Sequence, residues 1–272
     1  MRVPRKILAA AFALFSAGPV LQAQHSLWPE KPVEMFKENY VVTGVPLNTK
    51  PAYDTNDLTF QVSLRYNVVC LPKDWNIFFG YTQMTVWDVY RPSNPFRSNT
   101  YNPGLYFSHD FRLFDGNLLT GYEHRSNGYD SDKSRSLDYV FASLTGDFFD
   151  CVALQLTGRF GIGSMGNSFS LEMFDRYQGY LNAAICLHTP DRRLQATASV
   201  TPLFKGDIKA NISAEISYCP IADADWFHLT LRYHHGYDEN QNDCGTPDVF
   251  LKHMLRAGVS IQPRKMAHKL FF

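Results

Sequence analysis

The residues with the clearest chemical potential are a histidine, a serine and an aspartate in the middle of the chain. A serine becomes a nucleophile when a histidine accepts its proton and a third group orients that histidine. His124 and Ser126 are two positions apart, so on a β-strand they would point to the same face. Asp138 follows a polar loop, and pairing with an adjacent antiparallel strand would bring it beside His124. This spacing suggests a Ser–His–Asp hydrolytic site.

The strand face that carries His124 is the apolar one. Reading backwards, the same face holds Tyr122 and Leu118, whereas the opposite face holds Glu123 and Arg125. In a water-soluble protein a nucleophile and its base usually line a polar cleft. An apolar setting for this pair therefore indicates a face that looks at lipid.

Alternating segments of about ten residues, the length of a membrane-spanning β-strand, run along most of the chain. The clearest is 58–69, where Phe60, Val62 and Leu64 alternate with polar residues. This alternation is typical of a sheet with one apolar and one polar side. The sequence therefore predicts an all-β protein, an antiparallel transmembrane β-barrel of about 12 strands, at 39–45, 58–69, 76–89, 101–113, 117–127, 136–148, 152–163, 175–187, 194–203, 208–218, 227–237 and 250–262.

Short turns and longer polar loops alternate between these segments, which is the arrangement of bacterial outer-membrane barrels. Residues 71–74 and 189–192 are short turns, whereas 91–100 and 128–135 are longer. An even number of strands places both ends of the barrel on the short-turn, periplasmic side. The segment 117–127 would then run outward, so the candidate site would lie near the outer rim.

The N-terminal residues read as a targeting segment. Three basic residues precede an apolar run that is too short to span a membrane as a helix. We therefore expect a signal peptide at 1–23, a periplasmic lead at 24–37 and the barrel at 38–272. The five cysteines match no metal or haem motif and are expected to be structural, with their disulfide pairing open.

The composition gives no support for nucleic-acid binding. The formal net charge is zero and only 19% of the residues are charged, so the chain lacks the basic surface that such binding needs. No phosphate-binding loop or dinucleotide fingerprint is present. Membrane lipid is the partner that the pattern favours.

The central stretch Tyr122-Glu-His-Arg-Ser-Asn-Gly128, with Ser134-Arg-Ser136 after it, resembles the signature of the outer-membrane phospholipase A family. Tyr81-Thr-Gln83, Ser93-Asn-Pro-Phe-Arg97 and Asn99-Thr-Tyr-Asn-Pro103 are similar to an earlier strand and loop of that family. The resemblance extends from residue 39 to about residue 261. It implies a phospholipase A1/A2 of serine-hydrolase mechanism, which cleaves acyl esters of glycerophospholipids in the outer membrane.

Site residues follow from the resemblance by position. Ser126 matches the nucleophile, His124 the base and the amide of Gly128 the oxyanion hole. The third member is usually asparagine in the family, and here it is Asp138. A carboxylate would orient the imidazole more strongly but is costly beside lipid if it is unpaired.

The family also requires Ca²⁺, which is bound where two barrels meet. The matching ligands are the Tyr129 carbonyl, the Ser134 side chain and Ser93 of the partner subunit, and oxygen donors suit this hard cation. Gln83 matches a residue at the lipid-facing dimer seam, although a one-residue shift in register would turn it into the lumen. The resemblance thus implies a homodimer when active.

A non-catalytic reading stays open on the residues alone. Inward charges such as Arg65, Glu123 and Arg125 could line a channel, or the barrel could be purely structural. A twelve-strand barrel is narrow, however, and such charges would more readily form a plugging network.

Overall fold

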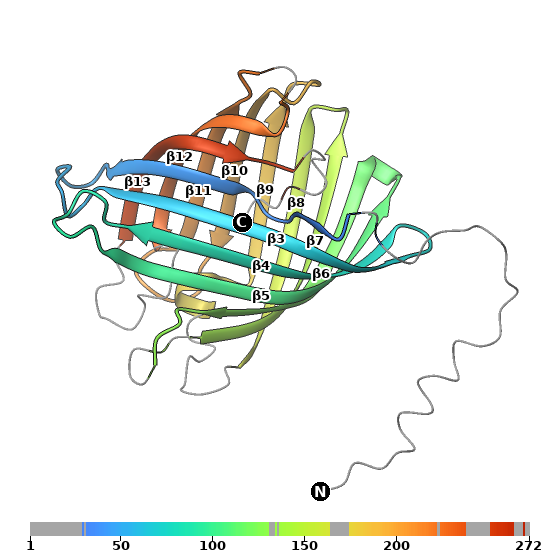
Figure 1. The fold of residues 1–272 in the computed structure, drawn as a ribbon, viewed down its shortest axis with the longest axis horizontal. Helices are drawn as coiled ribbons and strands as arrows, with labels where there is room; N and C mark the ends of the chain where they lie inside the picture. The colour runs from blue at the N-terminus through green and yellow to red at the C-terminus, as the bar shows by residue number, and fades with distance from the viewer. Residues whose placement is uncertain are drawn as a thin grey trace, which may run out of the picture.

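The computed structural model describes residues 29, 31–130, 134, 136–163, 174–221, 224–237, 251–263 and 269. Within them, the predicted antiparallel barrel is confirmed. Strands β2 to β13 each pair with their neighbours, and β13 pairs with β2 to close a wall of twelve strands. Figure 1 shows this wall with its strands steeply tilted. The predicted signal peptide lies outside the described residues.

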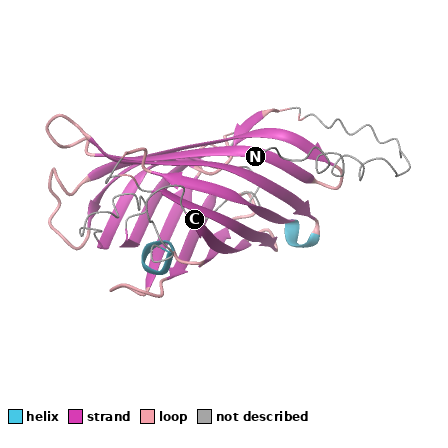
Figure 2. Ribbon diagram, turned by 90° about the horizontal axis from the view of Figure 1, so that it is seen from below, coloured by secondary structure: helices cyan, strands magenta, loops and turns pink. Residues whose placement is uncertain are grey.

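The strands agree with the predicted segments to within a few residues in most cases. Their bounds are β1 Val33–Met35, β2 Asn39–Pro46, β3 Asp57–Leu71, β4 Trp75–Trp87, β5 Phe96–Phe111, β6 Gly116–Ser126, β7 Ser136–Phe148, β8 Val152–Gly163, β9 Leu181–His188, β10 Leu194–Pro202, β11 Ala210–Tyr218, β12 Phe227–Tyr237 and β13 Leu251–Ile261. Two short helical turns, η2 Leu113–Asp115 and η4 Phe174–Gln178, complete the described elements (Figure 2).

One predicted strand begins later than expected. The segment 175–187 was expected to be extended throughout, but residues 174–178 form the turn η4 and β9 starts at Leu181. Gly179 has a φ of +68° and ends the turn, and Asp175 Oδ2 pairs with Lys205 Nζ at 2.7 Å. These tertiary contacts of a loop carry no periodic signal in the sequence.

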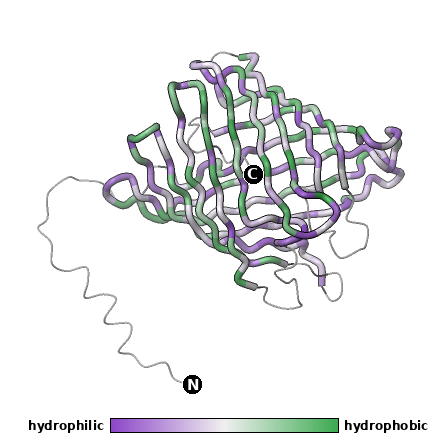
Figure 3. The backbone as a smooth tube through the Cα atoms, turned by 180° about the vertical axis from the view of Figure 1, so that it is seen from behind, coloured by the Kyte–Doolittle hydropathy of each residue, from purple (hydrophilic) through white to green (hydrophobic). Residues whose placement is uncertain are grey.

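Hydrophobic and hydrophilic residues alternate along the strands, as the hydropathy colouring of Figure 3 shows. Large apolar side chains such as Leu144, Leu156 and Ile216 are exposed on the outer face. Their inward neighbours are buried and largely polar, for example Ser143 and Thr157, whose hydroxyls are hydrogen-bonded at 2.8 Å. Apolar side chains outside and polar side chains inside are the reverse of the arrangement in a water-soluble protein, and they fit a barrel that is surrounded by hydrocarbon.

Two separate strands, β1 and β2, pair with the same edge of β3. Residues 57–61 of β3 pair with β2, whereas residues 64–66 of β3 pair with β1, where Val33 is opposite Tyr66. Between β1 and β2, Phe36, Lys37 and Glu38 are buried inside the barrel. The predicted lead at 24–37 therefore includes residues that join the sheet and fill the lumen.

Lys37 enters the lumen to neutralise a buried carboxylate. Its Nζ lies 2.6 Å from Glu123 Oε1, and Glu123 also accepts hydrogen bonds from the hydroxyls of Tyr106, at 2.7 Å, and Tyr139. The Glu123 side chain is only 1% exposed. Because a buried charge is costly without its partner, the N-terminal residues help to hold the barrel together.

Removing this partner is expected to destabilise the barrel. Lys37→Met should lower the free energy of unfolding by about 3–5 kcal/mol, the usual penalty for leaving a buried charge unpaired. The measurement is urea-induced unfolding in phospholipid vesicles. Lys50→Met changes a lysine in an exposed loop and serves as the control, and equal stabilities of the two variants would contradict the assignment.

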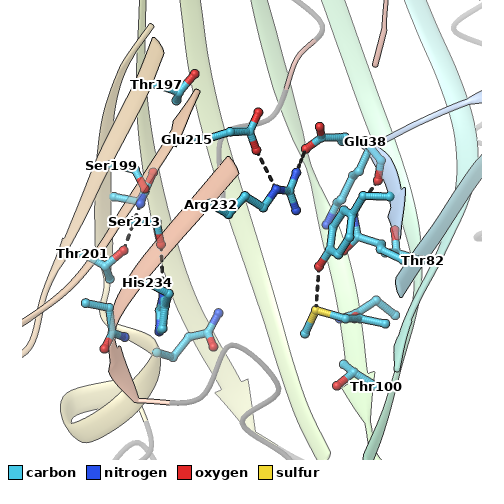
Figure 4. A pocket seen from close by; sticks show the side chains of 18 of the residues that line it. Glu38, Thr82, Thr100, Thr197, Ser199, Thr201, Ser213, Glu215, Arg232 and His234 are labelled. Carbon is cyan, nitrogen blue, oxygen red and sulfur yellow. Dashed lines mark hydrogen bonds and ion pairs between the residues drawn. The ribbon is translucent and has the colours of Figure 1, made fainter. Parts of the chain in front are cut away.

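A second ionic network fills the other side of the lumen. Arg232 lies between Glu38 and Glu215, with Nε 2.7 Å from Glu215 Oε2 (Figure 4). Lys269 Nζ lies 3.6 Å from Glu215 Oε1 and donates to Gln195 Oε1 at 2.9 Å. These cross-lumen contacts leave an interior cavity of about 270 Å³. The interior is therefore largely filled by paired side chains.

Within the described residues, no helix has the length and apolar character needed to cross a membrane. Four cysteines, Cys70, Cys151, Cys186 and Cys219, are free thiols. The fifth, Cys244, lies outside the described residues.

Candidate active site

Strands β6 and β7 place the predicted site residues side by side. They form an antiparallel hairpin in which His124 faces Asp138 and Ser126 faces Ser136. The outward side chain of Val140 on β7 is exposed, and Asp138 is two residues away on the same face. The structure thus brings His124, Ser126 and Asp138 together on the outer wall, near the end of β6 that leads into the long loop.

The contact between His124 and Asp138 is direct. His124 Nδ1 lies 2.8 Å from Asp138 Oδ1, and because a carboxylate can only accept, Nδ1 carries the proton and donates it. The aspartate side chain is 8% exposed and the histidine side chain 31% exposed. The carboxylate therefore fixes the tautomer and the orientation of a ring that still reaches the barrel surface.

A further group at the site was missed by the sequence analysis. The Tyr122 hydroxyl donates to Asp138 Oδ1 at 2.5 Å, so one carboxylate oxygen accepts from both Tyr122 and His124. This second donor compensates the charge of a carboxylate on a lipid-facing wall. The sequence contained a signal for this contact, because Tyr122 shares the strand face of His124. Tyr122 also pairs in register with Val140, which is two residues from Asp138.

Gly128 lies where the chain leaves β6 and turns sharply. Its φ is +73°, and a Cβ there would lie 2.7 Å from the Tyr101 ring, so both backbone and space favour glycine. Tyr101 in turn faces Ser126 across the β5–β6 pairing. The Asn127 side chain accepts from the Tyr129 amide at 3.2 Å, which orders the backbone beside the predicted oxyanion position.

An apolar groove runs across the outer wall from the candidate site. It has a volume of about 530 Å³ and extends over β6, β5, β4 and β3. Pro103 forms part of its lining between His124 and Tyr81, and Leu64 continues the lining on β3. Its lining is almost entirely apolar and its position is lipid-facing, so it suits an acyl chain better than a polar solute.

The residues expected to hold calcium lie on two loops at the same end of the barrel. Tyr129 and Ser93 are exposed and Ser134 is half-buried. No cluster of three or more His, Cys, Asp or Glu side chains occurs in the part of the chain that the structure describes. The expected donors are instead carbonyl and hydroxyl oxygens, which fit a hard cation.

The loop that carries Ser93 is held by a buried ion cluster. Asp88 pairs with Arg97 and, at 3.3 Å, with Arg91, and its carboxylate is 2% exposed. Ser93 and Asn94 both have positive φ, at 67° and 43°, a strain that persists only where surrounding contacts impose it. The ion pair of Asp88 with Arg97 thus links the two ends of the loop that carries Ser93.

Gln83 lies on the outer face, as the dimer-seam prediction requires. It shares that face with the exposed Tyr81, whose hydroxyl donates to Gln83 Oε1 at 3.1 Å, and its own amide donates to Thr85 at 3.5 Å. The lumen-facing alternative is therefore not the observed register. An amide on a lipid-facing wall is costly without polar partners, and Tyr81 and Thr85 supply them within the chain.

A closed barrel with an apolar outer wall, a filled lumen and an imidazole–carboxylate pair facing the bilayer defines a membrane-embedded barrel with a candidate site on its outer wall. Solved structures show the same fold. An outer membrane phospholipase A from Escherichia coli is 18% identical, with a TM-score of 0.70, and the match covers 86% of this chain and 95% of that chain. A calcium-bound dimer of the Salmonella typhi outer membrane phospholipase is 19% identical, with a TM-score of 0.71 and coverage of 87% and 94%.

The family model for phospholipase A1 matches residues 32–244, and the chain belongs to that family. The resemblance read from the sequence is confirmed, and the protein is a phospholipase of the bacterial outer membrane. No curated protein gave a significant match to the sequence.

Proposed function

We propose that this phospholipase hydrolyses acyl ester bonds of glycerophospholipids by a serine mechanism, with A1 and A2 activity, as a calcium-dependent dimer. The observation that carries the proposal is the 2.8 Å contact of His124 Nδ1 with Asp138 on the lipid-facing wall. In this arrangement Nε2 of His124 is the ring nitrogen that would accept the proton of the Ser126 hydroxyl. The groove beside His124 gives the acyl chain of a lipid a place next to the nucleophile.

The proposed reaction has two balanced halves. Ser126 Oγ attacks the ester carbonyl while His124 Nε2 takes its proton, and the same proton then passes to the departing lysophospholipid oxygen. Water next gives a proton to His124 while its oxygen attacks the acyl-serine, and His124 passes that proton to Ser126 Oγ as the fatty acid is released. The Gly128 amide would donate to the oxyanion.

Calcium would be held by the Tyr129 carbonyl, the Ser134 side chain and Ser93 of the partner subunit, and when bound it supplies positive charge near the developing oxyanion. The exposed position of Ser93, on a loop whose ends are linked by the ion pair of Asp88 with Arg97, supports its presentation to a partner. The Gln83 amide, which also lies on the outer wall, supports a subunit interface there.

The serine mechanism is tested by covalent labelling. A fluorophosphonate probe should add to Ser126 in the presence of calcium, as mapped by peptide mass spectrometry, and fatty acid release should stop with it. His124→Ala should prevent both. Labelling at another serine with unchanged hydrolysis would refute the assignment.

The oxygen-sharing geometry at Asp138 predicts unequal effects of two substitutions. Asp138→Ala should lower kcat by roughly 10²–10⁴-fold, because the imidazole loses its orienting acceptor. Asp138→Asn should lose far less, since an amide oxygen at the same place can accept from His124 and Tyr122. Fatty acid release from mixed micelles measures both, and equal losses would contradict the proposed role.

A conducting channel is the alternative function. Ion pairs cross the lumen through Arg232 and Lys37, and the remaining cavity of about 270 Å³ is small. The interior thus favours a scaffold for the outer wall over a pore.

A further inference from the structure

A pair of histidines lies on the outer wall away from the candidate active site. His235 on β12 faces His253 on β13 in register, and their ring centroids are 4.1 Å apart. Around the barrel β12 and β13 are six strands from β6 and β7, so the pair is on the opposite wall. Both residues are two positions from the long-loop ends of their strands.

The surroundings of this pair are apolar. Ile212 on β11 faces His235 in register, and the Leu47 amide donates to the His253 carbonyl at 2.7 Å on the other side. Both flanking side chains are exposed on the outer wall. Two adjacent imidazoles are therefore unusual among the apolar side chains of the outer wall, where a polar ring is costly unless it has a partner.

The ring nitrogens converge at a spacing that suits a metal ion. His235 Nδ1 lies 3.2 Å from Nδ1 and 3.0 Å from Nε2 of His253, and the Tyr233 hydroxyl lies 3.3 Å from His253 Nδ1. Two nitrogens each about 2.0–2.1 Å from one Zn²⁺, at angles near tetrahedral, are roughly 3.0–3.4 Å apart. His235 Nδ1 is nearly equidistant from the two nitrogens of His253 and so lies over that ring, and a turn of the His253 ring would point one of its nitrogen lone pairs at an ion held by His235.

We propose that His235, His253 and the Tyr233 hydroxyl form a binding site for a divalent transition-metal ion of the zinc or copper class. Imidazole nitrogens prefer these ions, whereas Ca²⁺ and Mg²⁺ prefer oxygen donors. The site is thus separate in ligand chemistry from the calcium proposed for catalysis. A bound ion would join β12 to β13 near the rim, and water would complete its coordination.

The test uses the full mature protein, without an affinity tag, in detergent micelles. Zn²⁺ is titrated in competition with a chromogenic indicator, in excess Ca²⁺. Wild type should bind about one more equivalent of Zn²⁺ than the double variant His235→Asn/His253→Asn, and each single variant should bind that equivalent roughly tenfold or more weakly. His109→Asn changes a histidine at the other end of the barrel, stacked on Trp75, and should bind as wild type does.

Two further measurements keep the result decisive. Zn²⁺ should raise the thermal unfolding temperature of wild type and of His109→Asn but not that of the double variant, because binding to the folded state stabilises it. Cu²⁺ bound to wild type should show nitrogen hyperfine coupling in its electron paramagnetic resonance spectrum. Equal Zn²⁺ stoichiometry in wild type and double variant, or a Cu²⁺ spectrum without nitrogen coupling, would overturn the site. Phospholipid hydrolysis is not a readout, so this test is independent of the proposed mechanism.

Discussion

Ser126→Ala is expected to abolish phospholipid hydrolysis, with a loss in kcat of at least about ten-thousand-fold. The hydroxyl is the only part of the side chain that the substitution removes, and the proposed acyl intermediate cannot form without it. His124→Ala should cost a similar factor, and the double variant should be no worse than either single one, because residues that act as a unit are not additive.

Ser136→Ala provides the matched control. Ser136 faces Ser126 directly across the β6–β7 pairing, so it shares the strand environment without a proposed chemical role. Its hydrolysis rate should stay near that of wild type, measured as fatty acid release from phospholipid micelles. Comparable losses in Ser126→Ala and Ser136→Ala would indicate a structural effect and would contradict the proposed nucleophile.

Removing calcium is expected to stop catalysis as completely as removing Ser126. A calcium-selective chelator should eliminate fatty acid release, and added Ca²⁺ should restore it, while the circular dichroism of the barrel stays unchanged. Full activity in the chelator would contradict the calcium proposal without affecting the assignment of the serine.

The proposed origin of Ser93 in the partner subunit can be tested by mixing two inactive variants. Ser93→Ala retains its own nucleophile, and Ser126→Ala retains a normal Ser93, so a mixed dimer holds one complete site. Random pairing should restore about a quarter of the wild-type rate, since roughly half of the dimers are mixed and each has one working site of two. Ser134→Ala mixed with Ser126→Ala should restore nothing, because these two residues belong to the same site in the same chain.

Much of the barrel could be predicted because period-two alternation is a local property. The face and register of β3, β6 and β7 follow from which side chains tolerate lipid, and register then places Asp138 beside His124 without further information. For the same reason the outward direction of the candidate site was predictable. Residue types and a strand pairing were sufficient for that part.

The remaining features depend on contacts between distant parts of the chain. Lys37 crosses to Glu123 and Lys269 to Gln195, and no periodicity marks residues that fill a lumen from outside the regular strands. The groove beside His124 is lined by residues from several strands, among them Leu64, Tyr81 and Pro103, which only the pairings of those strands bring together. The shift of β9 to Leu181 likewise reflects a loop held by tertiary contacts.

The groove on the outer wall has a kinetic consequence. A substrate that enters the groove from the membrane does not pass through water, so its effective concentration is its mole fraction in the surrounding bilayer or micelle. Diluting the phospholipid with inert detergent at constant total amphiphile should therefore slow turnover, whereas diluting both together should not. On the proposed mechanism, the lysophospholipid and the fatty acid would leave by the same lateral route and would compete with the substrate within the membrane.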